Sequence, residues 1–479
     1  MSSINIGDLV VQQWDLITRE KVEAVPTVGS TAPISAKWAV DHVKQYHNEH
    51  NDIGIPGTYG FGTGLCPEPL PPGFVELPGT RNILSHEYGN YRYIDGSVMV
   101  WRPAFYYRIG HPYNTTYNKY GFNSINIKPV STFSSHLDAI QQGYVLHRAF
   151  INNNKVHLGV MIDKYQCSNN NGIASSIRFK SPLTCSTTNN PFSLVGAVNE
   201  FRGAFAAAKT RGFQFHVMSR FEWSSCAMVS LAQAQHTTSS LITAWYDPNG
   251  ANNFPKGNNN NALSDQNDTT AMWKPSGYLN MGLTGSCGYS GNTNIFAKST
   301  DNGQACGIAD LNGNVWEINS GVVTTGDNAT DHGDVDNTLY VLKEHANIND
   351  LTGEWGSAWG SVEHLETLYS PCPVYYNIAP GVWPRVGNTS MQSFYSATSG
   401  ERYLRTSAGL PEVNGTSVSG TNLFGNDWAY YLPRANMCII SGGPWNIGIG
   451  AGVWSFSTNS YYRGSSDRTG FRTAMYLEN

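Results

Sequence analysis

Charge is scarce in this sequence, and that scarcity excludes several classes of protein. Of 479 residues only 14% are charged, with a net charge of −5, while 12% are aromatic and 49 are glycine. A helical bundle or a disordered chain would carry more Lys, Glu and Leu, so the composition favours a loop-rich protein of mostly β or irregular structure. The sequence also lacks the basic footprint typical of nucleic-acid binding, and we expect no nucleic-acid partner.

Long apolar runs are missing as well. No stretch approaches the roughly 20 residues needed to span a membrane, so no membrane insertion is expected. The first residues, Met1 to Leu9, lack the basic region and apolar core of a signal peptide, which predicts synthesis and folding in the cytoplasm.

Cysteine and histidine lack the spacings typical of metal sites. The eight cysteines include no Cys-x-x-Cys pair, and the thirteen histidines form no His-x-x-x-His or His-Glu-x-x-His, which argues against structural and catalytic zinc. Cys167 and Cys185 flank an Asn- and Ser-rich loop and could form a disulfide. Reduced, buried thiols are nevertheless the expectation for a protein folded in the cytoplasm.

The chain exceeds one ordinary domain, and its patterns divide it into three parts. Residues 1–52 are predicted to be an N-terminal attachment or oligomerisation segment with a helix over 35–50. Residues 53–144 are predicted to be a Gly- and Pro-rich linker and a small β-rich region, where Pro103 separates two strands. The main domain, 145–479, is predicted to contain strands over 157–165, 338–342 and 437–440, and helices over 198–211 and 220–234.

The C-terminal stretch has the composition of a recognition surface. Gly442-Gly443-Pro444-Trp445 and Gly470-Phe471-Arg472 enclose a run of small, aromatic and hydroxyl side chains. Tyr and Phe give contact area at low entropy cost, and Ser, Thr and Asn give adaptable hydrogen bonds. A binding face between two fixed ends is therefore predicted.

Four motifs, in the same order, resemble the formylglycine-generating-enzyme type of C-type lectin fold. They are Met161 to Asn169, Met218 to Trp223, Cys306 to Glu317, and the paired ends Gly442 to Trp445 and Gly470 to Arg472. The Gly-Asn-Val-Trp-Glu block over 313–317 and the paired ends are the specific ones. Across residues 145–479 the resemblance implies an α+β fold that is loop-rich, with short strands and two main helices, preceded by small β-rich N-terminal segments.

The resemblance implies binding and not catalysis. Enzymes of that family oxidise a substrate cysteine with two copper-holding cysteines close before the final Gly-Phe-Arg. This sequence has no cysteine after Cys438, and copper(I) needs thiolate ligands. A formylglycine-type oxidoreductase with a relocated site, and a glycan lectin of fixed specificity, stay open as alternatives.

The region from about 440 to 475 resembles that of the variable proteins of diversity-generating retroelements, in which this fold carries a hypervariable patch. The resemblance implies ligand-binding, variable positions at Asn446, Ile447, Ile449, Ala451, Phe456, Thr458, Ser460, Tyr461, Tyr462 and Ser465. Because recognition surfaces are rich in tyrosine, we expect Tyr461 and Tyr462 to be exposed and to bind, the alternative being burial in the core. It implies scaffold anchors at Gly443, Trp445, Gly470, Phe471 and Arg472, with Trp454 also internal. Arg463, Asp467 and Arg468 either contact the ligand or form an internal ion pair.

Residues 73–108 further resemble the stretch that precedes the lectin domain in phage tail-tip proteins. The implied protein is a phage tail-fibre tip adhesin in the virion. It would bind a host-surface protein or glycan, attach to other tail proteins and form a homotrimer.

The sequence offers two candidate cation sites. Asn314 and Glu317, with nearby carbonyls, resemble a structural calcium site of this fold, although they could instead only hydrogen-bond the loop while Trp316 fills the core. Asp327, Asp331, His332, Asp334 and Asp336 could hold a second cation, but such runs are more often solvated loop faces. No cofactor is otherwise required.

Overall fold

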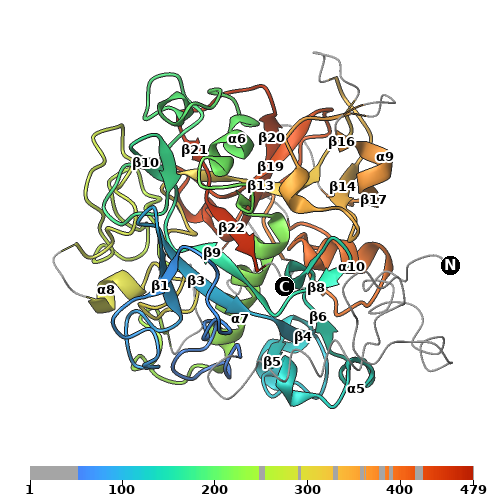
Figure 1. Cartoon of the computed structure of the whole chain (residues 1–479). Helices are drawn as coiled ribbons and strands as arrows, with labels where there is room; N and C mark the ends of the chain where they lie inside the picture. The colour runs from blue at the N-terminus through green and yellow to red at the C-terminus, as the bar shows by residue number, and fades with distance from the viewer. Residues whose placement is uncertain are drawn as a thin grey trace.

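The computed structural model describes residues 52–247, 254–289, 293–326, 333–356, 361, 363–376, 383–387, 392–415, 424 and 426–477. Within them the chain is a mixture of many short strands and few helices, which confirms the predicted loop-rich α+β class (Figure 1). The helix predicted over 35–50 lies outside the described residues. No helix in the described ranges is both long and apolar enough to cross a membrane.

One sheet joins the two ends of the described chain. Its order is β1 (Phe74–Glu76), β2 (Asn90–Tyr93), β3 (Val98–Pro103), β9 (Gly159–Asp163), β22 (Thr473–Tyr476) and β12 (His216–Val217). All neighbours are antiparallel. The C-terminal strand therefore lies beside β9, which in turn pairs with β3 (Figure 1). Residues 74–103 thus share a sheet with the main domain, and the part of the chain predicted as linker and small β-rich region does not stand apart from it.

The described residues also contain a small sheet and several short elements. The three-stranded sheet contains β5 (Ile125–Pro129), β4 (Phe105–Ile109) and β6 (Val145–Leu146), and two-stranded pairs join β7 (Ile151–Asn152) to β8 (Lys155–Val156), β10 (Ser168–Asn170) to β11 (Ile173–Ser175), and β15 (Trp355–Gly356) to β16 (Glu363–His364). The short helices are α4 (Tyr117–Tyr120), α5 (His136–Gln141), α8 (Thr293–Ala297), α9 (Leu365–Leu368) and α10 (Gly400–Ser407). As predicted, Pro103 ends one strand before the next begins at Phe105.

Helix α7 (Arg220–His236) is the central helix and confirms the prediction over 220–234. It begins with a capping box, in which the Ser219 hydroxyl accepts a hydrogen bond from the Glu222 backbone N–H and the Glu222 carboxylate accepts one from Ser219 N–H. Nearly all of its residues are buried, since sheets and loops pack on every side of it.

Helix α6 (Gly203–Lys209) is shorter than the helix predicted over 198–211. The residues before it pair with the C-terminal loop instead: Phe201 N–H donates to Gly464 O at 2.9 Å, and Arg202 N–H donates to Tyr462 O at 2.9 Å. A tertiary backbone pairing thus replaces the first helical turn, which helix propensity alone does not reveal.

The second large sheet carries the candidate site. Its order is β17 (Tyr369–Pro373), β14 (Thr338–Leu342), β13 (Trp316–Val323), β19 (Met437–Gly442), β20 (Gly452–Tyr461) and β18 (Ala429–Tyr430), with β21 (Thr469–Gly470) pairing parallel to β13. The strands predicted over 338–342 and 437–440 are confirmed. One face of this sheet packs on α7, because Arg220 Nη1 donates to Ser441 Oγ at 2.7 Å and its guanidinium lies over the Phe456 ring.

Candidate functional site

Two glycine-containing segments bracket the C-terminal stretch: Gly442-Gly443 at the end of β19, and Gly470 in β21. Gly443 has φ +81°, and a Cβ built there would lie 2.7 Å from Ala451 Cβ, so glycine is needed for both conformation and space. A Cβ on Gly470 would collide with the carbonyl oxygen of Leu183. Trp445, 4% exposed, packs beside Met281 and Val315.

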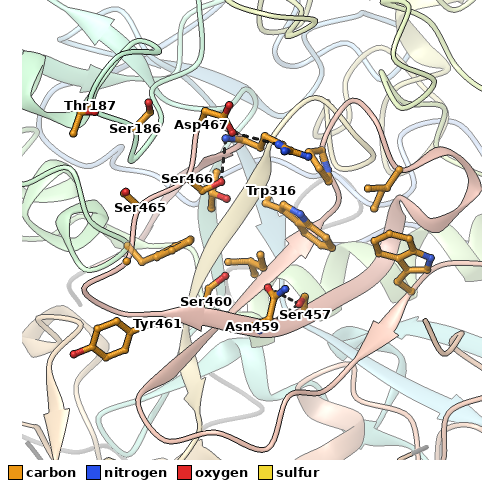
Figure 2. A pocket seen from close by; sticks show the side chains of 18 of the residues that line it. Ser186, Thr187, Trp316, Ser457, Asn459, Ser460, Tyr461, Ser465, Ser466 and Asp467 are labelled. Carbon is orange, nitrogen blue, oxygen red and sulfur yellow. Dashed lines mark hydrogen bonds and ion pairs between the residues drawn. The ribbon is translucent and has the colours of Figure 1, made fainter. Parts of the chain in front are cut away.

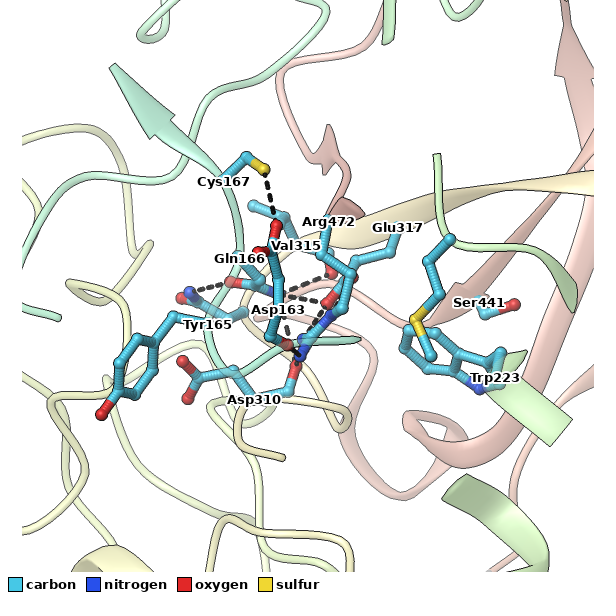
Figure 3. A network of polar contacts seen from close by, with 12 residues as sticks. Asp163, Tyr165, Gln166, Cys167, Trp223, Asp310, Val315, Glu317, Ser441 and Arg472 are labelled. Atoms are coloured by element: carbon cyan, nitrogen blue, oxygen red, sulfur yellow. Dashed lines mark hydrogen bonds and ion pairs between the residues drawn. The ribbon is translucent and has the colours of Figure 1, made fainter. Parts of the chain in front are cut away.

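The Gly470-Phe471-Arg472 end of the C-terminal stretch is fixed by a buried ion pair. Arg472 and Glu317 are both 0% exposed, and Arg472 donates to the two carboxylate oxygens through Nε and Nη2 at 2.6 Å each (Figure 3). Arg472 also donates to the backbone oxygens of Asp163 and Asp310. Phe471 is fully buried with its ring edge-on to Phe192, at 5.3 Å between centroids. Strand β13, strand β9 and the chain end are thereby joined at one point.

This network occupies the residues of the possible calcium site. Gln166 Nε2 donates to Glu317 Oε1, so both Glu317 oxygens accept hydrogen bonds from protein groups. Asn314 Oδ1 accepts from Asn258 Nδ2 at 3.1 Å and from Gly282 N at 2.7 Å. In this arrangement the two side chains hold the loop and do not fit calcium, which needs six to eight oxygen ligands.

The acidic loop offers no second site among the residues that can be placed. Asp327, Asp331 and His332 lie outside the described residues. The side chain of Asp334 is 87% exposed and forms an ion pair with Arg434 at 3.5 Å. Within the described ranges no group of three His, Cys, Asp or Glu side chains is arranged to hold a metal.

A cavity of about 710 Å³ opens beside β20, on the face of the sheet away from α7. Figure 2 shows Ser457, Asn459, Ser460 and Tyr461 along the strand, with Trp316 near the centre and the loop carrying Ser465, Ser466 and Asp467 across from them. The remaining lining residues are Ser186, Thr187, Phe201, Trp383, Trp428, Ile440, Pro444, Ile447, Gly464, Arg468 and Thr469. The cavity is therefore lined mainly by aromatic, hydroxyl and amide groups.

Strand pairing decides which side chains face this cavity. Ile440 is directly opposite Ser457, so the two side chains lie on one face, whereas Ser441 is opposite Phe456 on the face that packs on α7. Cys438 pairs with Ser460, so β20 carries one more residue than β19 between these pairs. This β-bulge puts Ser457 and Ser460 on the same face, although they are three residues apart.

Four of the ten predicted ligand-binding positions line the cavity: Ile447, Ser460, Tyr461 and Ser465. Asn446 and Ile449 are exposed on the turn before β20, outside the cavity lining. Ser457 and Asn459 also line it, although neither is among the predicted positions. They share one face of the strand with Tyr461 because residues two apart point the same way, and residue type alone does not reveal this.

The other four predicted positions are interior, which corrects the expectation that they are displayed. Ala451 is 0% exposed against Gly443, and Phe456 packs near Tyr376 and Arg220. Thr458 is 0% exposed and its hydroxyl accepts a hydrogen bond from Leu432 N. Tyr462, expected to be exposed, is 2% exposed with its ring 5.2 Å from that of Trp355.

The charged residues of the stretch form ion pairs. Arg468 Nε lies 3.3 Å from Asp467 Oδ1, and Arg463 Nη2 lies 3.4 Å from Glu354 Oε1. All four side chains are more than a third exposed, so these pairs contribute little to stability. Of the residues named as lining the cavity, Asp467 and Arg468 are those charged at neutral pH, and they offset each other.

All eight cysteines are unpaired and buried, as expected, and Cys167 and Cys185 do not form a disulfide. Burial raises the pKa of Cys185 to about 12 and raises the pKa of Cys438 further, so neither carries a thiolate at neutral pH. Cys185 has a structural part in the site: its sulfur accepts from Ser466 N at 3.2 Å and holds the loop opposite β20.

No protein-family model matches this chain, and no curated protein matches it. Among solved structures it is similar to the Major Tropism Determinant U1 Variant at 10% identity, with 90% of this chain and 73% of that chain covered and a TM-score of 0.25. The Major Tropism Determinant M1 Variant is 11% identical, with 90% of this chain and 74% of that chain covered and a TM-score of 0.26. The I1 Variant is 10% identical, with 90% of this chain and 73% of that chain covered and a TM-score of 0.27. TM-scores of this size do not establish a shared fold, so the site assignment rests on the chain's own contacts.

Proposed function

We propose that this chain is a non-enzymatic receptor-binding protein of a phage tail tip, built on a C-type lectin scaffold of the formylglycine-generating-enzyme type. The observation that carries the proposal is the cavity beside β20, lined largely by residues between the two bracketing glycine segments. The floor of the cavity comes from the C-terminal stretch. The anchor residues at the two ends of that stretch are buried, and Arg472 is hydrogen-bonded to the buried Glu317. A fixed frame around an adaptable surface suits a protein that selects ligands by contact.

The motifs that resemble the lectin family support one scaffold. The block containing Trp316 and Glu317 forms the start of β13, which pairs with β21 just before Phe471 and with β19 just before Gly443. Motifs more than a hundred residues apart in the sequence thus meet at the cavity. We further propose that the chain is diversified by a retroelement, that it attaches to other tail proteins, and that it forms a homotrimer in the virion.

The competing enzyme has little support in the site. An oxidoreductase of the formylglycine type needs accessible thiolates for copper. Cys438 is the cysteine nearest the C-terminal stretch in sequence, and its sulfur lies 3.1 Å from Ser460 O inside the sheet. Burial raises its pKa, which keeps it protonated.

The test is binding of the full chain to a panel of bacterial strains, measured by flow cytometry. Ser465→Trp puts a large side chain at an exposed position of the cavity lining and is expected to abolish binding. The matched control is Asn118→Trp, at an exposed position outside the cavity, which is expected to bind as the unmodified chain does. Equal binding by both variants, or no strain bound by the unmodified chain, would refute the proposal.

A further inference from the structure

The walls of the cavity differ from its floor in both residue type and origin. The walls contain Trp316, Trp383, Trp428 and Phe201, all outside the region from about 440 to 475 that we expect to vary. The floor contains Ser457, Asn459, Ser460 and Tyr461 from β20, faced by Ser465. The four aromatic wall residues therefore belong to a part of the chain that we do not expect to vary, and the floor belongs to the part that we do; the hydroxyls of Ser186 and Thr187 complete the lining from outside that part.

The wall includes an aromatic platform. The rings of Trp383 and Trp428 stack with centroids 4.5 Å apart and planes 17° apart, and Tyr430 lies 4.5 Å from Trp383. Trp383 is nonetheless 39% exposed, so part of this large apolar side chain stays in contact with solvent. The face of an aromatic ring carries partial negative charge and attracts the weakly positive C–H groups of a ligand.

The floor offers hydrogen bonds without net charge. Ser457 Oγ donates to Asn459 Oδ1 at 3.0 Å, which fixes the amide and leaves its Nδ2 without a hydrogen bond to another described residue. The hydroxyls of Ser460 and Ser465 likewise have no hydrogen-bond partner among the residues that the structure places. Asp467 and Arg468 carry opposite charges and lie 3.3 Å apart, so the named lining residues contribute no net charge to the cavity.

We propose, resting on the receptor-binding function above, that the ligand is an uncharged saccharide of a host-surface glycan. A sugar ring presents C–H groups on its faces and hydroxyls around its edge, which matches an aromatic wall above a floor of hydroxyl and amide groups. A cavity of about 710 Å³ also lies in the range typical of small-ligand pockets, roughly 300–1,000 Å³. The invariant wall selects the class of ligand, and the variable floor selects which sugar is bound.

The experiment starts from a strain that the full chain binds. Cells are treated with mild periodate, which cleaves sugar diols and leaves peptide bonds intact, or in parallel with proteinase K. The proposal predicts that periodate removes binding and proteinase K does not. Loss with proteinase K alone would overturn the saccharide proposal in favour of a polypeptide receptor, while leaving the receptor-binding function in place. If the full chain binds no strain, both the saccharide proposal and the receptor-binding function are refuted.

Variants of the wall provide the second arm, with polysaccharide released from the bound strain as the probe. Trp383→Ala is expected to weaken binding roughly tenfold, as loss of a good aromatic contact would, and Trp383→Phe to restore most of it. Tyr113→Ala, at a residue 82% exposed and outside the cavity, is the control and is expected to bind unchanged. Unchanged binding by Trp383→Ala would overturn the assignment of the wall.

Discussion

The buried pair of Arg472 and Glu317 gives the sharpest prediction about the frame, by which we mean the scaffold anchors Gly443, Trp445, Gly470, Phe471 and Arg472 and the residues that hold them. Arg472→Met removes the cation and leaves a carboxylate that is 0% exposed with only Gln166 to donate to it. Breaking a buried ion pair by removing one partner costs about 3 to 5 kcal/mol, because the remaining charge has lost both water and its partner. The free energy of unfolding is expected to fall by that amount.

The matched control is Arg81→Met, which removes an arginine that is 57% exposed and paired with Glu76 at 2.5 Å. Exposed pairs contribute about 1 kcal/mol or less, so this variant should be nearly neutral. Urea unfolding followed by tryptophan fluorescence measures both, with the slope of free energy against urea unchanged.

A double variant separates charge from packing. Arg472→Met combined with Glu317→Met removes the stranded carboxylate and is expected to be more stable than Arg472→Met alone. If Arg472→Met loses no more stability than Arg81→Met, then the ion pair is not what holds the C-terminal end, and our account of the frame is wrong.

Four further predictions concern the frame and its chemistry. Gly443→Ala should destabilise more than Gly172→Ala: both sites have positive φ, which costs about 1 to 2 kcal/mol, but only at Gly443 does the new Cβ meet another atom within 4 Å; equal losses in urea unfolding would count against the close contact. Burial lowers the pKa of His157 to about 4, so the unfolded chain binds an extra proton below its own pKa of about 6.5. Stability should therefore fall as pH drops from about 6.5 to 4, by up to about 3 kcal/mol, and His157→Gln should reduce that slope; an unchanged slope would contradict the shift. A thiol reagent should label no cysteine in the native chain and all eight in denaturant, since all are buried and unpaired, and rapid native labelling would contradict the burial. Adding calcium or a chelator should leave the melting temperature unchanged, because Glu317 and Asn314 already form hydrogen bonds with protein groups. A fall in melting temperature with the chelator that calcium reverses would show that these residues bind calcium.

Much of the frame could be predicted from the sequence because its signals are local. Ser219 followed by Glu222 predicts the start of α7, and Pro103 separates two strands by removing a backbone donor. The strand over 338–342 and the start of β19 follow from short β-prone runs. These features depend on neighbours within a few residues, so one sequence is enough to reveal them.

The orientation of the binding residues could not be predicted in the same way. Residue type alone favours an exposed Tyr462 and an exposed Phe456, yet both fill the core. The side of β20 that each residue occupies depends on its register against β19 and on the bulge between Ser457 and Ser460. Trp383 and Phe201 reach the cavity from distant loops, which no local pattern indicates.

The central claim is that recognition depends on the side chains that open into this cavity. Sequencing the gene across many isolates of the phage tests it most directly. The account predicts substitutions concentrated at Ser457, Asn459, Ser460, Tyr461 and Ser465, with Trp445, Trp454, Phe471 and Arg472 unchanged. Substitutions spread evenly along the chain, or concentrated at the interior positions Ala451, Phe456 and Tyr462, would contradict it.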